Sequence, residues 1–280
     1  MSGPEIVTTV AALRQRVSAW RAEGSRVGLV PTMGALHEGH LSLVHETGTR
    51  CDRTIVSIFV NPAQFAPHED FERYPRVLNA DIARLGASAE LVFTPSVVEM
   101  YPDGFATRLE VAGPALGLET DFRPHFFAGV ATVVAKLLLA AQPDIAMFGE
   151  KDYQQLLVVR RLARDLALPV EILGGEIVRE TDGLAMSSRN AYLDAHEREI
   201  AGRLNRVLKD VAARFRAGES PDAAEASGAK ALAAAGFDSV DYVAVRDAET
   251  LASAASLSAS VRVLAAARVG KTRLIDNMAA

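Results

Sequence analysis

The chain has 280 residues, and 49% of them are hydrophobic, which is enough apolar material for a substantial core. This composition excludes an intrinsically disordered protein. Thirty Lys and Arg residues against 35 Asp and Glu residues give a formal net charge of -5, without any basic tract. A nucleic-acid backbone is therefore excluded as the main partner, because proteins that bind it need a basic surface.

The single cysteine, Cys51, can form no intrachain disulfide, and there is no cysteine cluster for a structural zinc. Residues 1–17 lack the basic start and apolar core of a secretory signal. The longest apolar stretch, residues 130–141, is interrupted by Lys136 and is too short to span a bilayer. We therefore expect a cytoplasmic protein that has no membrane partner.

The first two thirds of the chain alternate short apolar, β-branched runs with amphipathic segments, which is typical of strands and crossover helices. This alternation predicts a Rossmann-like α/β fold with a doubly wound parallel sheet, in a domain of residues 1–190. Such folds bind their ligands beyond the carboxyl ends of the strands. We predict strands over residues 27–30, 54–60, 91–94, 145–148 and 170–178, and helices over residues 39–49, 77–85, 130–141 and 152–166.

After residue 190 the pattern changes, and we predict a smaller C-terminal α+β domain over residues 191–280. Apolar residues over 200–215 follow one face of a single long helix, with Asp194 as its N-cap and Glu197 as the N3 partner. A second, alanine-rich helix is expected over residues 220–236. Two strands over residues 240–245 and 261–266 follow, and then an extended segment at 273–276.

The first predicted strand leads directly into a helical pattern through a loop of small and polar residues. Small residues let the backbone approach a ligand, and the N–H groups at a helix N-terminus favour an anion. Two histidines three residues apart on one helical face can both donate to the same phosphate. Taken alone, however, the loop is better explained as a capped helix with two surface histidines. Its sequence is Pro31-Thr32-Met33-Gly34-Ala35-Leu36-His37-Glu38-Gly39-His40.

Another helix begins where the strand over 145–148 ends, with the sequence Gly149-Glu150-Lys151-Asp152-Tyr153-Gln154-Gln155. Lys151 offers a point charge for phosphate oxygens, and Asp152 offers an acceptor for ribose hydroxyls or a helix cap. Gln155 lies one turn after Lys151 on the same face. Alone, this segment is more simply an N-terminal helical turn with its lysine in solvent.

Two more polar loops follow strands. In the loop of residues 181–190, the hydroxyls of Ser187 and Ser188 and the guanidinium of Arg189 can hold a diphosphate, and Gly183 allows the loop to move. After the second strand, Asn61 and Gln64 offer buried amides that can orient a small polar substrate.

Each loop alone has a simple structural explanation, but all four follow strands of one predicted sheet. Independent accidents would not place two imidazoles, a lysine, an arginine, two hydroxyls and two amides at the same edge. The combination predicts displacement at a phosphorus atom of a nucleotide, stabilised by cations and hydrogen-bond donors.

These motifs resemble those of the pantothenate synthetase (pantoate:beta-alanine ligase) family of the nucleotidyltransferase superfamily. The resemblance implies that pantoate attacks the α-phosphate of ATP to give pantoyl adenylate and pyrophosphate. The amine of beta-alanine then displaces AMP and gives pantothenate, a precursor of coenzyme A. The matching segments, over residues 26–277, are PTMGALHEGHLSLV, VSIFVNPAQF, ERYPR, FGEKDYQQ, RETDGLAMSSRNAYL and AARVGKTRLIDN.

By motif position, the resemblance implies a role for individual residues. The ATP phosphates are assigned to His37 and His40, with His40 as proton donor, and to Lys151, Ser187, Ser188 and Arg189. The rest of the ATP site is assigned to Thr32, Met33, Gly34, Gly39, Gly149, Glu150, Asp152, Val178 and Met186. Pantoate is assigned to Gln64 and Gln155, with Gln64 also near beta-alanine, and Asn61 and Arg123 complete the substrate-binding set.

The resemblance also implies Mg²⁺ and a homodimer. The family has acidic residues after the YPR motif for the magnesium-bound nucleotide, and here Asn79 and Ala80 precede Asp81, the candidate metal ligand. ATP oxygens and water can supply the other ligands of this ion. A second departure is that Phe126, after His125, stands where the family has histidine.

Two alternative functions stay open. A different adenylyltransferase on the same scaffold would lack the pair of Gln64 and Gln155 in these contexts. A non-catalytic nucleotide-binding descendant would be favoured by the departures at Phe126 and Ala80. Retention of Lys151, of both histidines and of the MSSR sequence counts against it.

Overall fold

The computed structural model describes residues 3–66, 69–254 and 260–280, which divide into two compact units. The first unit contains the described residues up to Glu150 and the segment Gln155–Glu176. The second contains Lys151–Gln154 and the described part of Ile177–Ala280. The loop of residues 177–190, which we predicted to belong to the first domain, is thus grouped with the second unit. No helix in the described part of the chain is long and apolar enough to cross a membrane.

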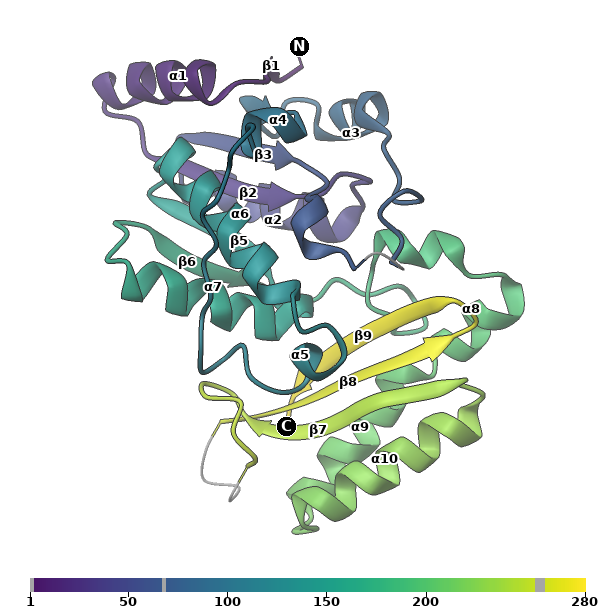
Figure 1. The fold of residues 1–280 in the computed structure, drawn as a ribbon. Helices are drawn as coiled ribbons and strands as arrows, with labels where there is room; N and C mark the ends of the chain where they lie inside the picture. The colour runs from purple at the N-terminus through teal and green to yellow at the C-terminus, as the bar shows by residue number, and fades with distance from the viewer. Residues whose placement is uncertain (1–2, 67–68, 255–259) are drawn as a thin grey trace. The chain divides into compact units, whose positions relative to one another are not determined.

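The first unit is built on a parallel sheet of six strands in the order β1-β4-β3-β2-β5-β6 (Figure 1). From β2 the chain adds β3 and β4 on one side, and it then returns to add β5 and β6 on the other side. The point between β2 and β5 is therefore the topological switch point, where open α/β sheets bind ligands. The strands are β1 (Glu5–Val7), β2 (Val27–Thr32), β3 (Arg53–Ile58), β4 (Leu91–Phe93), β5 (Ile145–Gly149) and β6 (Glu171–Gly175).

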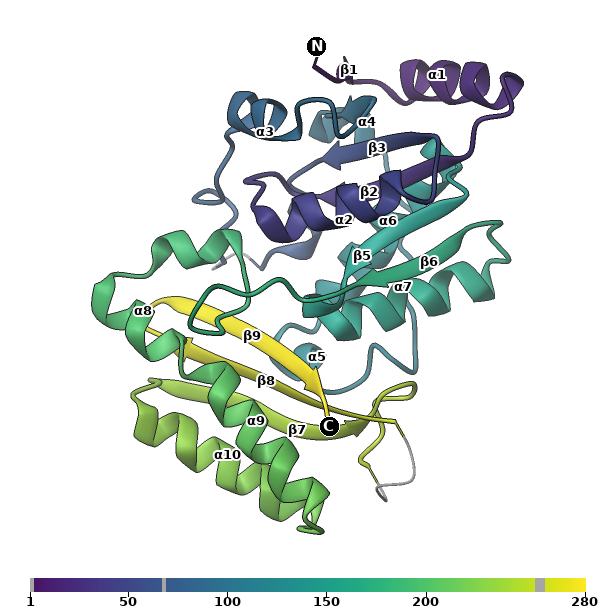
Figure 2. The ribbon, with the colours of Figure 1, turned by 180° about the vertical axis from the view of Figure 1, so that it is seen from behind.

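Helices cover both faces of this sheet, with α2 on one face and α6 on the other (Figures 1 and 2). Every residue of α6 is buried except Lys136 and Leu139, so the apolar stretch singled out in the sequence is a core helix. α1 packs beside α6, where Arg14 donates to the carbonyl of Leu139 at 3.4 Å. The helices of this part of the chain are α1 (Val10–Ala22), α2 (Glu38–Gly48), α3 (Leu78–Leu85), α4 (Val97–Met100), α5 (Glu119–Phe122), α6 (Phe126–Ala141) and α7 (Tyr153–Asp165), with short 3₁₀ helices η1 (Pro62–Gln64) and η2 (Glu150–Asp152).

Two adjacent glycines explain how β6 is packed between α7 and α2. A Cβ atom on Gly174 would lie 2.8 Å from Leu156 of α7, and one on Gly175 would lie 2.2 Å from Leu43 of α2. Successive side chains of a strand point to opposite faces, so the two helices cover opposite faces of the sheet here. The glycines are needed because both helices approach the strand backbone.

The predicted doubly wound sheet is confirmed, with differences at its ends. β1 and α1 were not predicted, and neither were the short helices α4 and α5. β6 ends at Gly175, whereas we predicted a strand up to residue 178, because its partner β5 ends opposite, at Gly149. Residues 176–178 thus have no strand beside them and leave the sheet.

The second unit has an antiparallel sheet of three strands in the order β7-β8-β9, covered on one face by α9 and α10 (Figure 2). Their apolar side chains form a core with Val243, Val263 and Leu274 of the three strands. The predicted smaller α+β fold is confirmed. Its elements are η3 (Ser188–Tyr192), α8 (Ala195–Ala201), α9 (Leu204–Arg216), α10 (Pro221–Ala235), β7 (Ser239–Asp247), β8 (Val261–Val269) and β9 (Thr272–Ala279).

The single long helix expected over 200–215 is wrong, because the chain forms two helices, α8 and α9, with a break at Gly202. A Cβ atom on Gly202 would lie 2.3 Å from the Asp182 carboxylate, so the glycine permits a close approach at the break. The predicted cap is confirmed: Asp194 accepts from the Glu197 amide at 2.8 Å, and the Glu197 side chain accepts from the Asp194 amide at 3.0 Å.

Candidate active site

The loop after β2 has an unusual backbone that a buried carboxylate holds in place. Gly34 and Ala35 both have positive φ values, 84° and 50°. The Asp81 side chain of α3 accepts from the amide of Ala35 at 3.0 Å and from that of Leu36 at 2.7 Å. Asp81 is only 1% exposed, so it fixes the loop from inside the protein. The start of the loop is fixed as well, because the Gly34 amide donates to the Thr32 hydroxyl at 3.2 Å.

His37 and His40 lie together at the end of this loop. His37 is the N-cap of α2, and its Nδ1 accepts from the Gly39 amide at 3.2 Å. The Nδ1 of His40 accepts from the His37 amide at 3.3 Å, and the two ring centroids are 4.1 Å apart. Because both Nδ1 atoms accept, the neutral rings carry their proton on Nε2. In that state both Nε2 atoms carry a hydrogen, and the two rings stand at the N-terminus of a helix, a position that favours anions.

The loop after β3 lies next to the loop after β2. Thr32 and Ile58, the last residues of these strands, are paired in register, and Gln64 Nε2 lies 3.0 Å from the sulfur of Met33. Asn61 is 1% exposed and Gln64 is 9% exposed, so both amides are buried, as the sequence predicted. The two loops therefore bring a carboxamide close to the segment that leads to the histidines.

A tyrosine that the sequence did not indicate fixes the orientation of these amides. The Tyr101 hydroxyl donates to Asn61 Oδ1 at 2.7 Å. Asn61 Nδ2 then donates to Gln64 Oε1 at 3.1 Å and to the Gly129 carbonyl at 3.2 Å. Gln64 is thereby oriented with its NH₂ group as the donor on the Met33 side. Burial raises the pKa of Tyr101 to about 12, although the hydrogen bond to Asn61 opposes this, so the phenol keeps its proton at neutral pH.

Arg123 forms an ion pair with the carboxylate of Glu69. It donates to both oxygens of Glu69, at 2.6 and 2.8 Å, and to the Gln64 carbonyl at 3.2 Å. Its guanidinium lies 3.8 Å from the ring centroid of Phe126, the residue at which this chain departs from the family pattern. Burial alone would raise the pKa of Glu69, but the hydrogen bonds and charge of Arg123 outweigh it and lower that pKa. Direct substrate binding by Arg123 stays a prediction, and its contacts support the backbone at Gln64.

At the end of β5, on the other side of the switch point, Gly149 and Glu150 continue the sheet edge of the first unit. The next two residues, Lys151 and Asp152, belong to the second unit. The Lys151 ammonium lies 3.8 Å from the Asp152 carboxylate, and its side chain is 21% exposed. Gln155, in α7, is grouped again with the first unit.

The other predicted nucleoside and phosphate residues of the second unit lie in one turn and the segment after it. The Met186 amide donates to the Val178 carbonyl at 3.0 Å, so these two residues face each other across the turn. Gly183, with φ 96°, allows the chain to reverse. The following Ser187 is the N-cap of η3 and accepts from the Arg189 amide at 3.3 Å.

An arginine of α8 holds the outer end of this turn. Arg198 donates to the Glu180 carboxylate at 2.6 Å and to the two oxygens of Asp182 at 2.5 and 3.0 Å. The hydrogen bonds from Arg198 are the main cause that lowers the pKa of Asp182. Arg198 therefore binds the carboxylates of both Glu180 and Asp182, close in sequence to the two serines.

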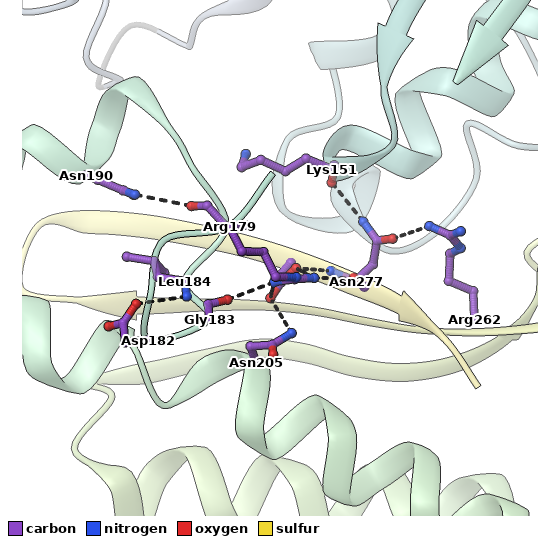
Figure 3. Close-up of polar contacts among 11 residues, drawn as sticks. Lys151, Arg179, Asp182, Gly183, Leu184, Asn190, Asn205, Arg262 and Asn277 are labelled. Atoms are coloured by element: carbon purple, nitrogen blue, oxygen red, sulfur yellow. Dashed lines mark hydrogen bonds and ion pairs between the residues drawn. The ribbon is translucent and has the colours of Figure 1, made fainter. Parts of the chain in front are cut away.

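A second network joins the turn and the lysine segment to the C-terminal strand (Figure 3). Asp276 accepts from both terminal nitrogens of Arg179, at 2.7 and 2.9 Å, and Arg179 also donates to the Gly183 carbonyl at 3.0 Å. Asn277 donates to the Lys151 carbonyl at 2.9 Å. Asp276 and Asn277 lie in the quoted LIDN segment, yet sequence reasoning gave them no role, because a motif match names residues and not their contacts.

The arrangement does not fit a metal centre built from protein ligands. Both oxygens of Asp81 accept from backbone amides, and the side chain is buried. Across the residues that the structure describes, no three His, Cys, Asp or Glu side chains are grouped as a metal site requires. The role of Asp81 as a metal ligand stays a prediction, and the contacts it makes are those of a loop anchor.

Comparisons with known proteins agree on one family. The family model for pantoate-beta-alanine ligase matches residues 5–279. The pantothenate synthetase of Mesorhizobium japonicum is 60% identical over 99% of this chain and 98% of its own length. The crystal structure of pantothenate synthetase from Thermus thermophilus is 48% identical, with a TM-score of 0.91 over 98% of each chain.

A further crystal structure adds ligands to this comparison. It is that of the pantoate-beta-alanine ligase from Francisella tularensis, complexed with beta-gamma ATP and beta-alanine. It is 32% identical and has a TM-score of 0.82, over 99% of this chain and 97% of its own.

Proposed function

The chain belongs to the pantoate-beta-alanine ligase family, and from this premise we propose how it makes pantothenate from pantoate, beta-alanine and ATP. In the first step a carboxylate oxygen of pantoate attacks the α-phosphorus of ATP. The bond from that phosphorus to pyrophosphate breaks, which leaves pantoyl adenylate. In the second step the neutral amine of beta-alanine attacks the acyl carbon, the bond from that carbon to the AMP oxygen breaks, and the nitrogen releases one proton as the amide forms and AMP leaves.

One observation carries the proposal: two imidazole rings and an oriented carboxamide stand on neighbouring loops at the carboxyl edge of the sheet. The Nε2–H groups of His37 and His40 are donors for the charge that grows on the phosphate oxygens as pyrophosphate leaves. The NH₂ group of Gln64 is a donor for an oxygen of pantoate. A carboxylate nucleophile is already ionised near neutral pH, so the step needs alignment and charge stabilisation more than a strong base.

We assign the remaining phosphate contacts to residues of the second unit. Lys151 supplies a cationic point charge, and Arg189 supplies a planar fork of donors that suits phosphate. The hydroxyls of Ser187 and Ser188 add two donors in the segment before it. The nucleoside is assigned to Val178 and Met186, which face each other across one turn, and to Met33, Gly149 and Asp152. Pantoate is assigned to Gln64 and Gln155.

We assign Mg²⁺ to the nucleotide and not to a protein cage. The ion commonly keeps several waters and binds substrate phosphates through few protein groups. The engaged, buried carboxylate of Asp81 agrees with this assignment. Bound to ATP, the ion would neutralise phosphate charge; the residues named above orient the substrates.

The proposal includes a cytoplasmic homodimer, as the family resemblance implies. Light scattering coupled to size-exclusion chromatography tests the oligomeric state. A molar mass equal to that of one chain across micromolar concentrations would contradict the dimer.

Pyrophosphate release from ATP tests the proposed reaction. We expect release that depends on pantoate, with AMP and pantothenate appearing only after beta-alanine is added. If pantoate supports no release although ATP binds, a different adenylyltransferase or a non-catalytic descendant is the better explanation. Release that needs pantoate and beta-alanine together, with no adenylate trapped beforehand, would contradict the two-step order.

A further inference from the structure

We propose that two adjacent residues of β9, Asp276 and Asn277, are positioning residues that fix the Lys151 segment and the Gly183 turn to one another. The inference rests on the proposed function only where it assigns phosphate to these segments. Asp276 and Asn277 are each 2% exposed, so neither side chain is available to a substrate from solvent. Their contacts with Lys151, Arg179 and Arg262 lie within the second unit.

Asn277 holds the backbone of the lysine segment. Its Nδ2 donates to the Lys151 carbonyl at 2.9 Å, across 126 positions of sequence. Its Oδ1 accepts from Arg262 at 2.5 Å, which fixes the orientation of the amide. Figure 3 shows the Lys151 carbonyl directed at Asn277, while the lysine side chain extends away from that contact. The bond therefore restrains the backbone from which the ammonium projects.

The lysine segment, residues 151–154, has another attachment to the rest of the second unit. The Arg262 guanidinium lies 3.8 Å from the ring centroid of Tyr153, and the Tyr153 hydroxyl donates to the Ala248 carbonyl at 2.8 Å. Arg262 thus contacts both Asn277 and Tyr153. These contacts attach residues 151–154 to the second unit, whereas their neighbours in sequence belong to the first.

Asp276 holds the turn through Arg179. The bidentate pair is nearly closed to solvent on the aspartate side, where the side chain is 1% exposed. Arg179 uses its other donor directions for the Gly183 carbonyl at 3.0 Å and the Asn277 carbonyl at 3.1 Å. One guanidinium thereby ties the glycine of the turn to the strand residue that holds Lys151. A buried charge-assisted network of this kind is costly to disturb.

The consequence is a fixed spacing between two groups of proposed phosphate donors. Lys151 and the Ser187–Arg189 segment are far apart in sequence, and neither lies in a regular strand. Phosphate stabilisation depends on donors that are already in place, and displacement by about 1 Å can cost on the order of 10²-fold in rate. We therefore expect the β9 pair to affect the adenylation step without touching substrate.

A double-mutant cycle tests whether Asn277 acts through Lys151. Asn277→Ala is expected to lower kcat for pantoate-dependent pyrophosphate release by about 10- to 100-fold with little change in KM for pantoate. In a Lys151→Ala background the same substitution should cost less than about twofold, because there is no ammonium left to misplace. A full loss in both backgrounds would overturn the inference.

Two companion variants separate positioning from folding. Asn277→Asp keeps an acceptor for Arg262 and replaces the donor to Lys151 by a charged oxygen that repels the Lys151 carbonyl. It should therefore show at least the same loss of kcat, and the added charge beside Arg262 compensates for part of the stability that the alanine variant loses. Arg273→Ala removes a partly buried ion pair with Asp241 in the same sheet, at 2.6 Å, and should lower stability without lowering kcat. Wild-type kcat for Asn277→Asp, or an equal kcat loss for Arg273→Ala, would contradict the positioning role.

Amide hydrogen exchange tests whether β9 restrains the Lys151 segment and the Gly183 turn, and it needs no assumption about substrate. Asn277→Ala should speed exchange over residues 151–154, and Asp276→Asn should speed it at Gly183 and Met186, whose amides close the turn. The core of α9 should exchange as in the wild type. Unchanged exchange at these positions would overturn the inference, and a wild-type protein that releases no pyrophosphate would instead count against the proposed reaction alone.

Discussion

Replacing Asp81 by asparagine tests whether this carboxylate is an anchor for the loop after β2. The substitution keeps the shape of the side chain but exchanges one acceptor oxygen for an NH₂ group. One of two amides, the part-buried amide of Ala35 or the buried amide of Leu36, then loses its acceptor. A buried polar group left without a partner costs about 1–3 kcal/mol, so we expect the free energy of unfolding to fall by that amount.

The same change should lower activity, because the loop conformation is intrinsically unfavourable. A left-handed backbone costs a residue other than glycine about 1–2 kcal/mol, and Ala35 has φ 50°. The bonds to Asp81 offset this cost. Losing one of them makes the ordered loop less favourable by a similar amount, and about 1.4 kcal/mol corresponds to a tenfold change in rate. We expect kcat to fall about tenfold, since His37 follows directly after Leu36.

Urea unfolding and a Mg²⁺ titration of pyrophosphate release together distinguish an anchor from a metal ligand. An anchor predicts lower stability and lower kcat at an unchanged half-saturating Mg²⁺ concentration. Asn79→Ala, an exposed change on the same helix, is the control and should stay within about 0.5 kcal/mol of wild type. Wild-type stability in Asp81→Asn combined with a higher Mg²⁺ requirement would refute the anchor and restore the ligand.

Three more outcomes are expected. Lys151→Ala should lower pantoyl adenylate formation by about 10²–10³-fold, measured as pyrophosphate release in a single turnover, and near-normal turnover would remove its assigned role. Tyr101→Phe should raise KM for pantoate and cost about 1 kcal/mol of stability, because Gln64 loses its fixed orientation. An unchanged KM would contradict the orientation of Gln64 by Tyr101 through Asn61. The pKa of Tyr101 is raised from 10.0 to about 12, so the unfolded chain loses this proton first, and wild-type stability should fall as pH rises from 10 toward 12. Tyr101→Phe should lack that part of the loss, and identical alkaline unfolding profiles would show that Tyr101 does not cause it.

Hydrophobic periodicity was sufficient to predict the sheet, because buried parallel strands need apolar runs whatever their neighbours are. Periodicity was a less reliable guide to the elements at the N-terminal edge of the sheet. β1 has three residues, and two of them are exposed, so its apolar signal is weak. The missed helix α1 did carry a signal, since Leu13, Val17 and Trp20 are buried at helical spacing and Thr9 caps it.

The break between α8 and α9 shows what periodicity cannot resolve. Ile200 before the break and Leu204 after it are buried in the same cluster, so one apolar face continues across two helices. The signal at the break is Gly202, a poor helix former. Its reason lies elsewhere in the chain, in the close approach of Asp182, which no local pattern contains.

The same distinction separates the site residues that the sequence predicted from those it did not. His37 and Gln64 stand in loops directly after strands, so the topology of a parallel sheet was enough to place them at one edge. Gln64 is oriented through Asn61 by Tyr101, which lies 40 positions from Asn61 in sequence. The loop before His37 is held by Asp81, which lies 45 positions from Leu36 and which the sequence indicated only as a candidate metal ligand. Nothing in their local sequence encodes the contact, because a buried hydrogen bond is determined by tertiary packing. Candidate substrate contacts can therefore be proposed from local motifs, whereas the residues that would position them are found only in the folded structure. Mutations at the second kind should affect stability and rate together.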